Sequence, residues 1–267
     1  YPVISLSLKS MKQPTYQLSF EMMKKTVSEE FLRHWPAVEH SRKLTEAQRE
    51  RFLRLRDLGG TAADYADALK FLSECLHICC EEKAVILIDE YDALLANSYF
   101  CGFYDETISF IRSLFESALK TNEHLAFAVV TGCLRISKES IFTGLNNLKM
   151  NSITTELYSE HFGFTQSEVD QILSFYSLEK QRDLLRQWYD GYQFGFTEVY
   201  NPWSVINYIE LCTQNEKALP RPYWSNTSSN SIVRSLVERA DLSVKQEIES
   251  LIAGKTITKP IHEDITY

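Results

Sequence analysis

The sequence predicts an α/β protein in which a parallel sheet is followed by a helical domain. Residues 84–88 form a continuous apolar run that ends at Asp89, which is typical of a strand buried on both faces. A second apolar run covers residues 125–130, and residues 106–120 between the two runs carry apolar side chains at helical spacing. A strand, a helix and a strand in this order predict parallel strands joined by a right-handed crossover. From about residue 163 onward only helical patterns follow.

The first half of the chain supplies one more strand and three more helical segments. Residues 3–8 are expected to form the additional strand. Pro36 is expected to stop the first helix, and Thr45 with Gln48 predicts a capping box at the start of the second. The expected helices cover residues 15–35, 45–58 and 61–80.

A change of architecture is predicted near residue 162. A further strand is expected at residues 153–158, just before this point. We therefore predict an α/β domain over residues 1–162 and a helical, lid-like domain over residues 163–267.

Helix start signals define the elements of the second half. Thr165 and Glu168 form a capping-box pattern. Asn201 is a predicted N-cap residue, and Pro202 would occupy the first helical position after it. Two further helices are expected at residues 230–239 and 243–253.

Composition excludes several classes of protein. The chain has 267 residues, of which 44% are hydrophobic and 24% charged, as in globular proteins rather than disordered ones. Its net charge of −8 disfavours indiscriminate binding of nucleic acid over the whole surface. No apolar run approaches the ~20 residues that a membrane-spanning helix needs, and no signal-peptide pattern opens the sequence. The six cysteines lack the spacing of a disulfide framework, so a cytoplasmic location is expected.

One cysteine-rich segment has the ligand types of a zinc site. Cys75, His77, Cys79 and Cys80 fall within a predicted helix. No second ligand pair occurs at the spacing of a zinc finger. Because buried thiols behave as small hydrophobic groups, packing is the favoured interpretation.

The residues with the clearest chemistry follow the two apolar runs. Asp89 and Glu90 come at the carboxyl end of the first run, where open α/β sheets place their sites. An aspartate there can hold Mg²⁺, and the next carboxylate can polarise an attacking water. Thr131 and Arg135 follow the second run, where they could sense a terminal phosphate and stabilise its charge. A solvated acidic turn and a surface arginine explain the same pattern equally well.

Nucleotide hydrolysis of this kind also needs a phosphate-binding loop with the pattern G-x-x-x-x-G-K-[ST]. Gly254-Lys255-Thr256 matches only the last three letters, and Glu249 stands in place of the first glycine. The triplet follows a predicted helix rather than a strand. We therefore interpret it as the end of that helix.

Aromatic residues are dense in two segments of the second half, residues 188–194 and 200–203. Aromatic side chains can stack on nucleic-acid bases. Few basic residues accompany them, only Arg182 and Arg186 upstream, so packing in a core is the favoured interpretation.

Several separate blocks occur in the order of a known family. They are I-D-E-Y-D at residues 88–92, T-G-C-L-R-I-S-K-E-S-I-F at 131–142, G-L-N-N-L at 144–148, W-Y-D-G-Y at 188–192 and Y-N-P-W-S at 200–204. Together they resemble the AAA-ATPase-like family of bacterial and eukaryotic-parasite proteins. The resemblance covers nearly the whole chain. Many members of that family carry a PD-(D/E)XK nuclease-like domain after the ATPase-like part.

The resemblance implies a P-loop NTPase fold of the AAA-like branch, which binds ATP with Mg²⁺. Asp89 and Glu90 match the Walker B acidic pair, so Asp89 would coordinate Mg²⁺ and Glu90 would activate water. Asp92 matches a further family acid and is assigned with Asp89 to cofactor binding. Thr131 and Arg135 fall where such folds place a sensor.

The chain departs from the family at both ends, because neither the phosphate loop nor the nuclease-like domain is in the sequence. We therefore expect a middle part of a longer protein that alone hydrolyses ATP poorly or not at all. In AAA-like sheets the phosphate-loop strand lies between the strands expected here at residues 125–130 and 153–158. A vacancy or a replacement pairing is thus predicted between them.

Three functions are open at this point. The favoured one is part of an ATPase that regulates an attached nuclease-like domain or a protein partner. Nucleic acid would be bound only through the parent protein. The second is a degenerate ATPase fold that binds protein or nucleic acid without turnover. The third is a metal-dependent hydrolase built on Asp89, Glu90 and Asp92, with His124 or His161 approaching in space.

Overall fold

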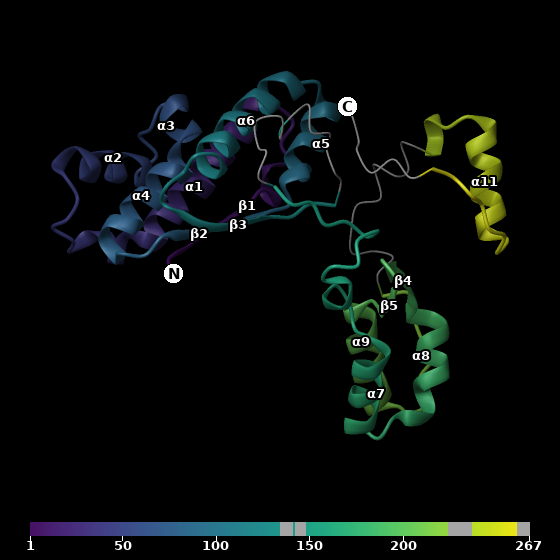
Figure 1. Ribbon diagram of the computed structural model, residues 1–267. Helices are drawn as coiled ribbons and strands as arrows, with labels where there is room; N and C mark the ends of the chain where they lie inside the picture. Colours follow the sequence, from purple (N-terminus) through teal and green to yellow (C-terminus); the bar gives the residue numbers. More distant parts are fainter. Residues whose placement is uncertain (134–140, 142–147, 224–236, 261–267) are drawn as a thin grey trace. The chain divides into compact units, whose positions relative to one another are not determined.

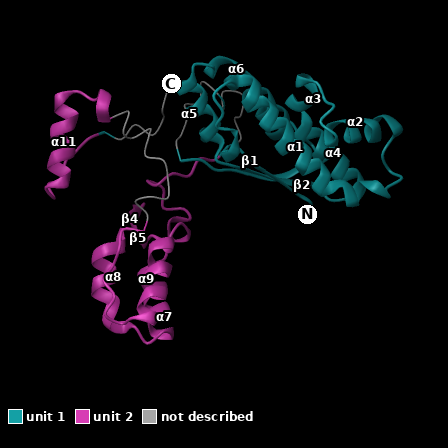
Figure 2. Ribbon diagram, turned by 180° about the vertical axis from the view of Figure 1, so that it is seen from behind, with its two compact units in different colours: residues 1–148, 260–267 teal, residues 149–259 magenta. Residues whose placement is uncertain are grey.

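The computed structural model describes residues 1–133, 141, 148–223 and 237–260, which form two compact units (Figure 2). Unit 1 comprises residues 1–148 and 260–267, and unit 2 comprises residues 149–259. Each unit has its own hydrophobic core. The domain boundary predicted near residue 162 lies within unit 2.

Unit 1 is built on a three-stranded parallel sheet (Figure 1). Leu6 pairs with Ile88, and Ile88 pairs in turn with Val130, so the second strand is central. The predicted α/β arrangement with parallel strands is confirmed. The strands, in their order across the sheet, are β1 (Val3–Ser7), β2 (Ala84–Asp89) and β3 (Leu125–Val130).

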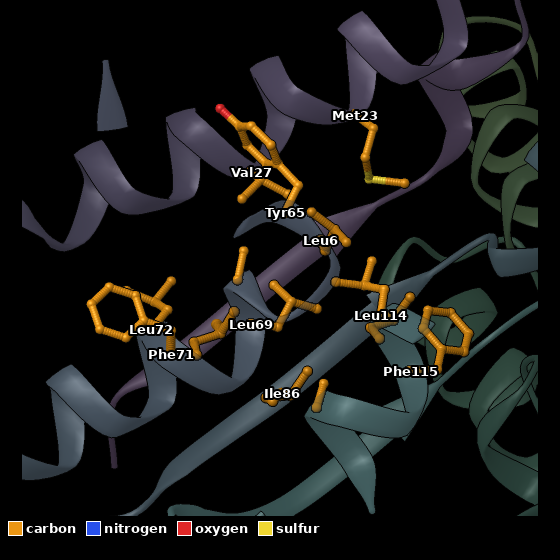
Figure 3. Packing of buried hydrophobic residues seen from close by; sticks show 14 of the residues in the cluster. Leu6, Met23, Val27, Tyr65, Leu69, Phe71, Leu72, Ile86, Leu114 and Phe115 are labelled. Carbon is orange, nitrogen blue, oxygen red and sulfur yellow. The ribbon is translucent and has the colours of Figure 1, made fainter. Parts of the chain in front are cut away.

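Helices cover one face of this sheet. The side chains that point to this face, such as Leu6 and Ile86, are fully buried. Figure 3 shows them packed among Val27, Leu69 and Leu114, which come from three different helices. The helices of this layer are α1 (Tyr16–Glu39), α4 (Ala68–Cys80), α5 (Tyr91–Cys101) and α6 (Tyr104–Leu119).

The opposite face of the sheet carries apolar side chains that stay exposed among the described residues. Phe127 is 64% exposed, Val129 40% and Leu87 37%. The register places Leu87 directly beside Val129, so these side chains form one patch. Parallel strands are usually covered on both faces. The described chain therefore supplies a cover for only one of them.

The predicted strand at residues 153–158 is wrong. The Thr155 backbone N–H donates to the Ser152 carbonyl oxygen at 3.0 Å, and the Ser152 N–H donates to Thr155 Oγ1 at 3.1 Å. Hydroxyl side chains thus stabilise a local turn in competition with a strand. Ile153, the first apolar residue of the expected strand, is 62% exposed.

The outer edge of β3 consequently has no neighbouring strand in the described part of the chain. A groove of about 530 Å³ runs beside it, with Asn122, Phe127 and Leu148 in its lining. Leu148 is the last residue of the G-L-N-N-L block at residues 144–148. The predicted vacancy lay between β3 and a strand at residues 153–158. Because those residues form no strand, the vacancy stays a prediction.

The outer edge of β1, by contrast, is closed by side chains of α1. Glu30 Oε1 accepts a hydrogen bond from the Ser5 backbone N–H at 2.7 Å. Arg33 donates to the Val3 carbonyl oxygen, and His34 Nε2 lies 3.0 Å from the same oxygen. Because an open strand edge invites pairing with another strand, these contacts protect the β1 edge and leave the β3 edge as the accessible one.

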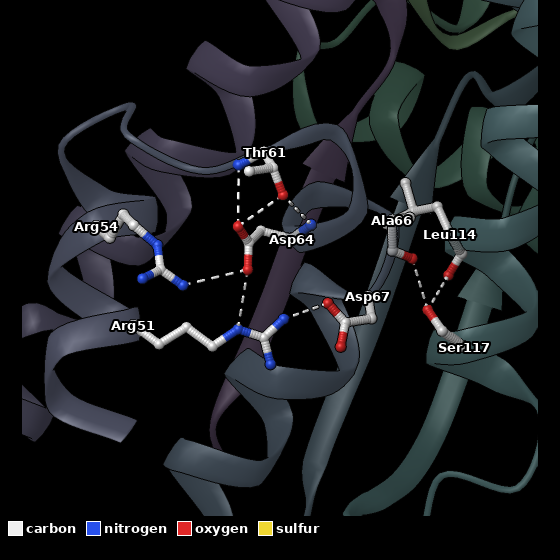
Figure 4. A network of polar contacts seen from close by, with 8 residues as sticks. All are labelled: Arg51, Arg54, Thr61, Asp64, Ala66, Asp67, Leu114 and Ser117. Carbon is white, nitrogen blue, oxygen red and sulfur yellow. Dashed lines mark hydrogen bonds and ion pairs between the residues drawn. The ribbon is translucent and has the colours of Figure 1, made fainter. Parts of the chain in front are cut away.

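A polar network joins helices that lie between β1 and β2 in the sequence (Figure 4). The carboxylate of Asp64 accepts from the Thr61 backbone N–H at 2.9 Å and lies 3.5 Å from Arg51 Nε and 3.3 Å from Arg54 Nη2. Arg51 also pairs with Asp67. The predicted capping box at Thr45 is confirmed, and Thr61 forms a second one with Asp64. The helices joined are α2 (Glu46–Arg56), α3 (Ala62–Ala66) and α4.

Three helical predictions in unit 1 need correction. Pro36 does not stop the first helix. It lies in the last turn of α1, which ends at Glu39. The helix expected over residues 61–80 is two helices that meet at Asp67. Helix α5 begins directly after Glu90 and was not anticipated, because its apolar residues surround the helix without a single apolar face.

Unit 2 combines helices with a β-hairpin that the helical prediction missed. The caps at Thr165 and Asn201 are confirmed, as is the helix expected from residue 243. The helix expected at residues 230–239 falls largely outside the described residues. The elements are η2 (Ser159–His161), α7 (Gln166–Phe175), η3 (Glu179–Gln181), α8 (Arg182–Tyr189), β4 (Asp190–Phe194), β5 (Thr197–Tyr200), α9 (Pro202–Gln214) and α11 (Leu242–Ile252).

Candidate functional site

The candidate site lies at the carboxyl ends of β2 and β3. Asp89 is the last residue of β2, and Glu90 follows it with a left-handed backbone conformation, φ 52° and ψ 46°. Glu90 is also the residue that precedes α5. A left-handed conformation costs free energy for a residue with a side chain. The sharp turn it makes places the Glu90 carboxylate at the sheet end, 30% exposed.

Thr131 and Asp89 meet at this end of the sheet. The Thr131 hydroxyl donates to Asp89 Oδ1 at 2.6 Å. The backbone holds this pair in place, because the Thr131 N–H donates to the Ile88 carbonyl at 2.8 Å and the Tyr91 N–H donates to the Thr131 carbonyl at 3.0 Å. The structure thus brings together two of the predicted site residues that are 42 positions apart.

Asp92 has a different environment from Asp89 and Glu90. It lies in the first turn of α5 and is only 5% exposed. Its Oδ1 accepts a hydrogen bond from the Cys133 backbone N–H at 3.2 Å. Asp92 therefore anchors the segment that leaves β3, and it is more remote from solvent than the other two carboxylates.

Among the described residues, the surroundings of the site are mainly acidic, with Lys9 and Lys12 as basic neighbours. Lys9, from the short helix η1 (Lys9–Met11) after β1, has its Nζ 3.6 Å from Glu90 Oε1. Burial raises the pKa of the Cys133 thiol, Asp92 and Glu90 raise it further, and Lys12 opposes them. An acidic field of this kind favours the binding of a cation.

Gly132 allows the close approach on which this arrangement depends. A Cβ atom at this position would lie 2.6 Å from Asp92 Oδ1 and 2.6 Å from Tyr91 Cε1. Both neighbours are 5% exposed and packed, so they have little room to move. The sequence motif contained this glycine, but its role becomes visible only from the contact.

Replacement of Gly132 by alanine is expected to destabilise unit 1 by about 1–3 kcal/mol, because the new methyl group overpacks a filled space. The midpoint of thermal unfolding should fall by roughly 2–8 °C, as circular dichroism would measure. Cys133→Ala is the matched control, since the exposed Cys133 side chain takes no part in the backbone contact. Equal midpoints for Gly132→Ala and the unmodified chain would show that the loop accommodates a side chain.

The remaining predicted candidates are Arg135, His124 and His161. Arg135 falls outside the described residues. His124 precedes β3, at the end of the strand opposite to Thr131, and its Nδ1 lies 3.0 Å from His77 Nδ1. His161 belongs to unit 2. The geometry of unit 1 thus keeps His124 away from the three acids and removes it from the hydrolase hypothesis.

The cysteine-rich segment and the Gly254 triplet have structural explanations. Cys75 is fully buried in α4, as the packing interpretation predicted. Among the described residues no group of three or more His, Cys, Asp or Glu side chains is arranged to hold a metal ion. Gly254 has φ +73° after the end of α11, and the Lys255 N–H donates to the Ser250 carbonyl at 2.9 Å. This is a helix end.

Among the described residues, no helix is both long and apolar enough to cross a bilayer.

Comparison with known proteins gives one family and one relative. A family model described as "Predicted AAA-ATPase" matches residues 1–142. An "Uncharacterized protein in vnfD 5'region" of Azotobacter chroococcum mcd 1 is 33% identical over 165 residues. The match covers 61% of this chain but only 31% of the relative, so the relative is much the longer protein. No solved structure matches the chain.

Proposed function

Because the chain belongs to the predicted AAA-ATPase family, we propose that the acidic end of its sheet is one half of an ATPase site. The observation that supports this best is the contact between Asp89 and Thr131 at the ends of adjacent parallel strands. Ligands of open α/β sheets bind beyond such carboxyl ends. The site then belongs to the Walker B and sensor part of the fold.

The donor set fits Mg²⁺. Asp89 is an exposed carboxylate and Thr131 an exposed hydroxyl, and oxygen ligands of this kind suit a hard cation. Asp89 would hold the ion, which when bound would neutralise charge on the phosphates. Asp92 supports this arrangement indirectly, because its Oδ1 accepts a hydrogen bond from the Cys133 backbone N–H.

Glu90 is proposed as the base that takes a proton from the attacking water. Its carboxylate is more accessible than that of Asp92, and its strained backbone conformation is typical of functional positions. Lys9, whose Nζ lies 3.6 Å from Glu90 Oε1, would help to orient this carboxylate. Thr131 would exchange its contact with Asp89 for one with the terminal phosphate, and Arg135 would stabilise the charge that develops there.

The phosphate-binding segment is proposed to come from another part of the full-length protein and to pack along β3. Three features support this position: the unpaired outer edge of β3, the groove beside it, and the exposed Phe127 and Val129 on the adjoining face. The β1 edge is closed by Glu30 and Arg33, so it offers no equivalent place. ATP binding is thus expected of the whole protein more than of this chain alone.

We propose that ATP hydrolysis at this site regulates an attached nuclease-like domain or a protein partner. Nucleic acid would be bound only by other parts of the parent protein. A second candidate is a fold that binds partners without turnover. It is favoured by the exposed sheet face and by the lack of a phosphate loop among the described residues.

Asp89→Asn in the natural full-length protein tests the proposal. We expect Mg²⁺-dependent ATP affinity to fall about tenfold or more, because a charged oxygen ligand becomes neutral. Titration calorimetry with ATP, with Mg²⁺ or with EDTA, would measure this. The control is Asp105→Asn, an exposed acid on α6. Absence of ATP binding by the unmodified full-length protein would refute the ATPase and support the binding module.

A further inference from the structure

Two hydrogen bonds hold the segment after β3 against the start of α5. The Tyr91 backbone N–H donates to the Thr131 carbonyl oxygen at 3.0 Å. The Cys133 backbone N–H donates to Asp92 Oδ1 at 3.2 Å. Gly132 lies between these two contacts, so close to α5 that a Cβ atom there would meet Asp92 Oδ1 at 2.6 Å. The segment is therefore fixed on both sides of Gly132.

Asp92 is the side chain on which the second contact depends. It lies in the first turn of α5 and is 5% exposed, whereas Asp89 is exposed. The N-terminal end of a helix stabilises a negative charge, and a hydrogen bond to a carboxylate is stronger than one between neutral groups. Asp92 is thus well suited to hold a backbone N–H. The exposed Asp89 is better placed for an ion that also binds phosphates and water.

The contact between Asp92 and Cys133 joins the two functional parts of the candidate site. Glu90, the proposed base, stands two positions before Asp92. Thr131, the proposed sensor, stands two positions before Cys133. Only one residue separates each of them from the contact, and those two intervening residues lie directly against each other. The position of Thr131 relative to Glu90 therefore depends on the hydrogen bond that Asp92 accepts.

We propose that Asp92 is a positioning residue of the ATPase site, which fixes Thr131 relative to Glu90 and is itself no ligand of Mg²⁺ or ATP. The inference rests on the proposed function, because it assigns a task within that site. Displacement of a reacting group by about 1 Å can cost about 100-fold in rate. Loss of a positioning residue therefore lowers turnover, whereas loss of a ligand lowers affinity.

Alanine and asparagine at position 92 of the natural full-length protein test this assignment. Asp92→Ala removes the acceptor, so turnover at saturating ATP should fall about 10- to 100-fold, while affinity for ATP with Mg²⁺ should change less than about threefold. Asp92→Asn keeps an oxygen that can accept from the Cys133 N–H, so turnover should stay within about threefold of the unmodified protein. Phosphate release and titration calorimetry measure the two quantities.

Asp105→Ala is the matched control, because it removes an exposed acid from the first turn of the next helix, α6. It should change neither turnover nor affinity by more than about twofold. Two results would overturn the assignment. A fall in ATP affinity of about tenfold or more in Asp92→Asn would make Asp92 a ligand. Unchanged turnover in Asp92→Ala would show that the site keeps its geometry without this carboxylate.

Hydrogen exchange in the 267-residue chain separates this inference from the proposed function. Asp92→Ala should speed exchange of the Cys133 amide about tenfold or more, and leave that of Ile86 in β2 unchanged. If circular dichroism shows that Asp92→Ala is unfolded, Asp92→Ser replaces it, because the serine hydroxyl is too short to reach Cys133. Unchanged exchange at Cys133 in a folded variant would overturn the positioning by Asp92. Absence of ATP turnover by the unmodified full-length protein would refute the proposed function itself, and the exchange result would still decide whether Asp92 holds the segment.

Discussion

Glu90→Gln is expected to reduce ATP turnover of the full-length protein about 100-fold or more while ATP affinity stays close to that of the unmodified protein. Glutamine has nearly the same size, but it cannot take a proton from water, and positioned general bases contribute factors of this order. The pattern of lost turnover with retained binding distinguishes a base from a ligand. Phosphate release at saturating ATP measures the first quantity, and calorimetry with Mg²⁺ and ATP measures the second.

Glu82→Gln serves as the matched control for this experiment. Glu82 precedes the same strand and is exposed, at the end of β2 opposite to the site. Its replacement should leave turnover within about twofold, because surface changes remote from a site have small effects. Unchanged turnover in Glu90→Gln would show that another group activates water. Lost affinity in Glu90→Gln would instead assign Glu90 to binding.

The position of the candidate site could be predicted because it follows from local pattern and topology. The apolar runs before Asp89 and Thr131 mark buried strands, and a short βαβ connection makes them parallel. Parallel neighbouring strands end at the same edge of the sheet, so Asp89 and Thr131 must meet there. No contact information beyond the chain order is needed for this step.

The rest of the site depends on contacts between residues distant in sequence. The burial of Asp92 and the need for Gly132 arise because the segment after β3 crosses the first turn of α5. Nothing local in T-G-C marks the glycine as a point of close approach. Likewise, Lys9 reaches Glu90 only because η1 follows the strand next to β2.

The errors in the fold have the same origin. Residues 153–158 contain strand-forming residues, but the hydrogen bonds between Ser152 and Thr155 hold their start in a turn, and they join no strand among the described residues. The β4–β5 hairpin was missed because its aromatic residues adjoin helical patterns and its two-residue loop, Gly195-Phe196, is not the Asn-Gly or Asp-Gly pair that marks a hairpin most strongly. Tertiary pairing decides both cases.

Glu30→Gln is expected to destabilise unit 1 by about 3 kcal/mol near neutral pH. Burial alone would raise the pKa of the Glu30 carboxyl, but hydrogen bonds from His34, Arg33 and the Ser5 N–H lower the pKa to about 2. A fall from 4.5 to about 2 corresponds to roughly this free energy. Glutamine keeps the shape but removes the charge that Arg33 and the β1 edge require. Urea unfolding, with hydrogen exchange of the Ser5 amide, measures the loss.

The pH dependence separates the charge of Glu30 from its packing. A carboxyl whose pKa is lowered on folding stabilises the protein fully above its unfolded pKa, and this stabilisation disappears as pH falls through the folded value. The difference between the unmodified chain and Glu30→Gln should therefore be constant above about pH 5.5 and shrink from about pH 4.5 toward pH 2. Glu29→Gln, at a neighbouring position that is 62% exposed, should change stability by less than about 0.5 kcal/mol throughout. An equal loss for Glu30→Gln at pH 7 and pH 3 would mean that shape, and not charge, closes the β1 edge. A faster exchange of the Ser5 amide without global unfolding would localise the effect to that edge, which is the feature that leaves β3 as the open side of the sheet.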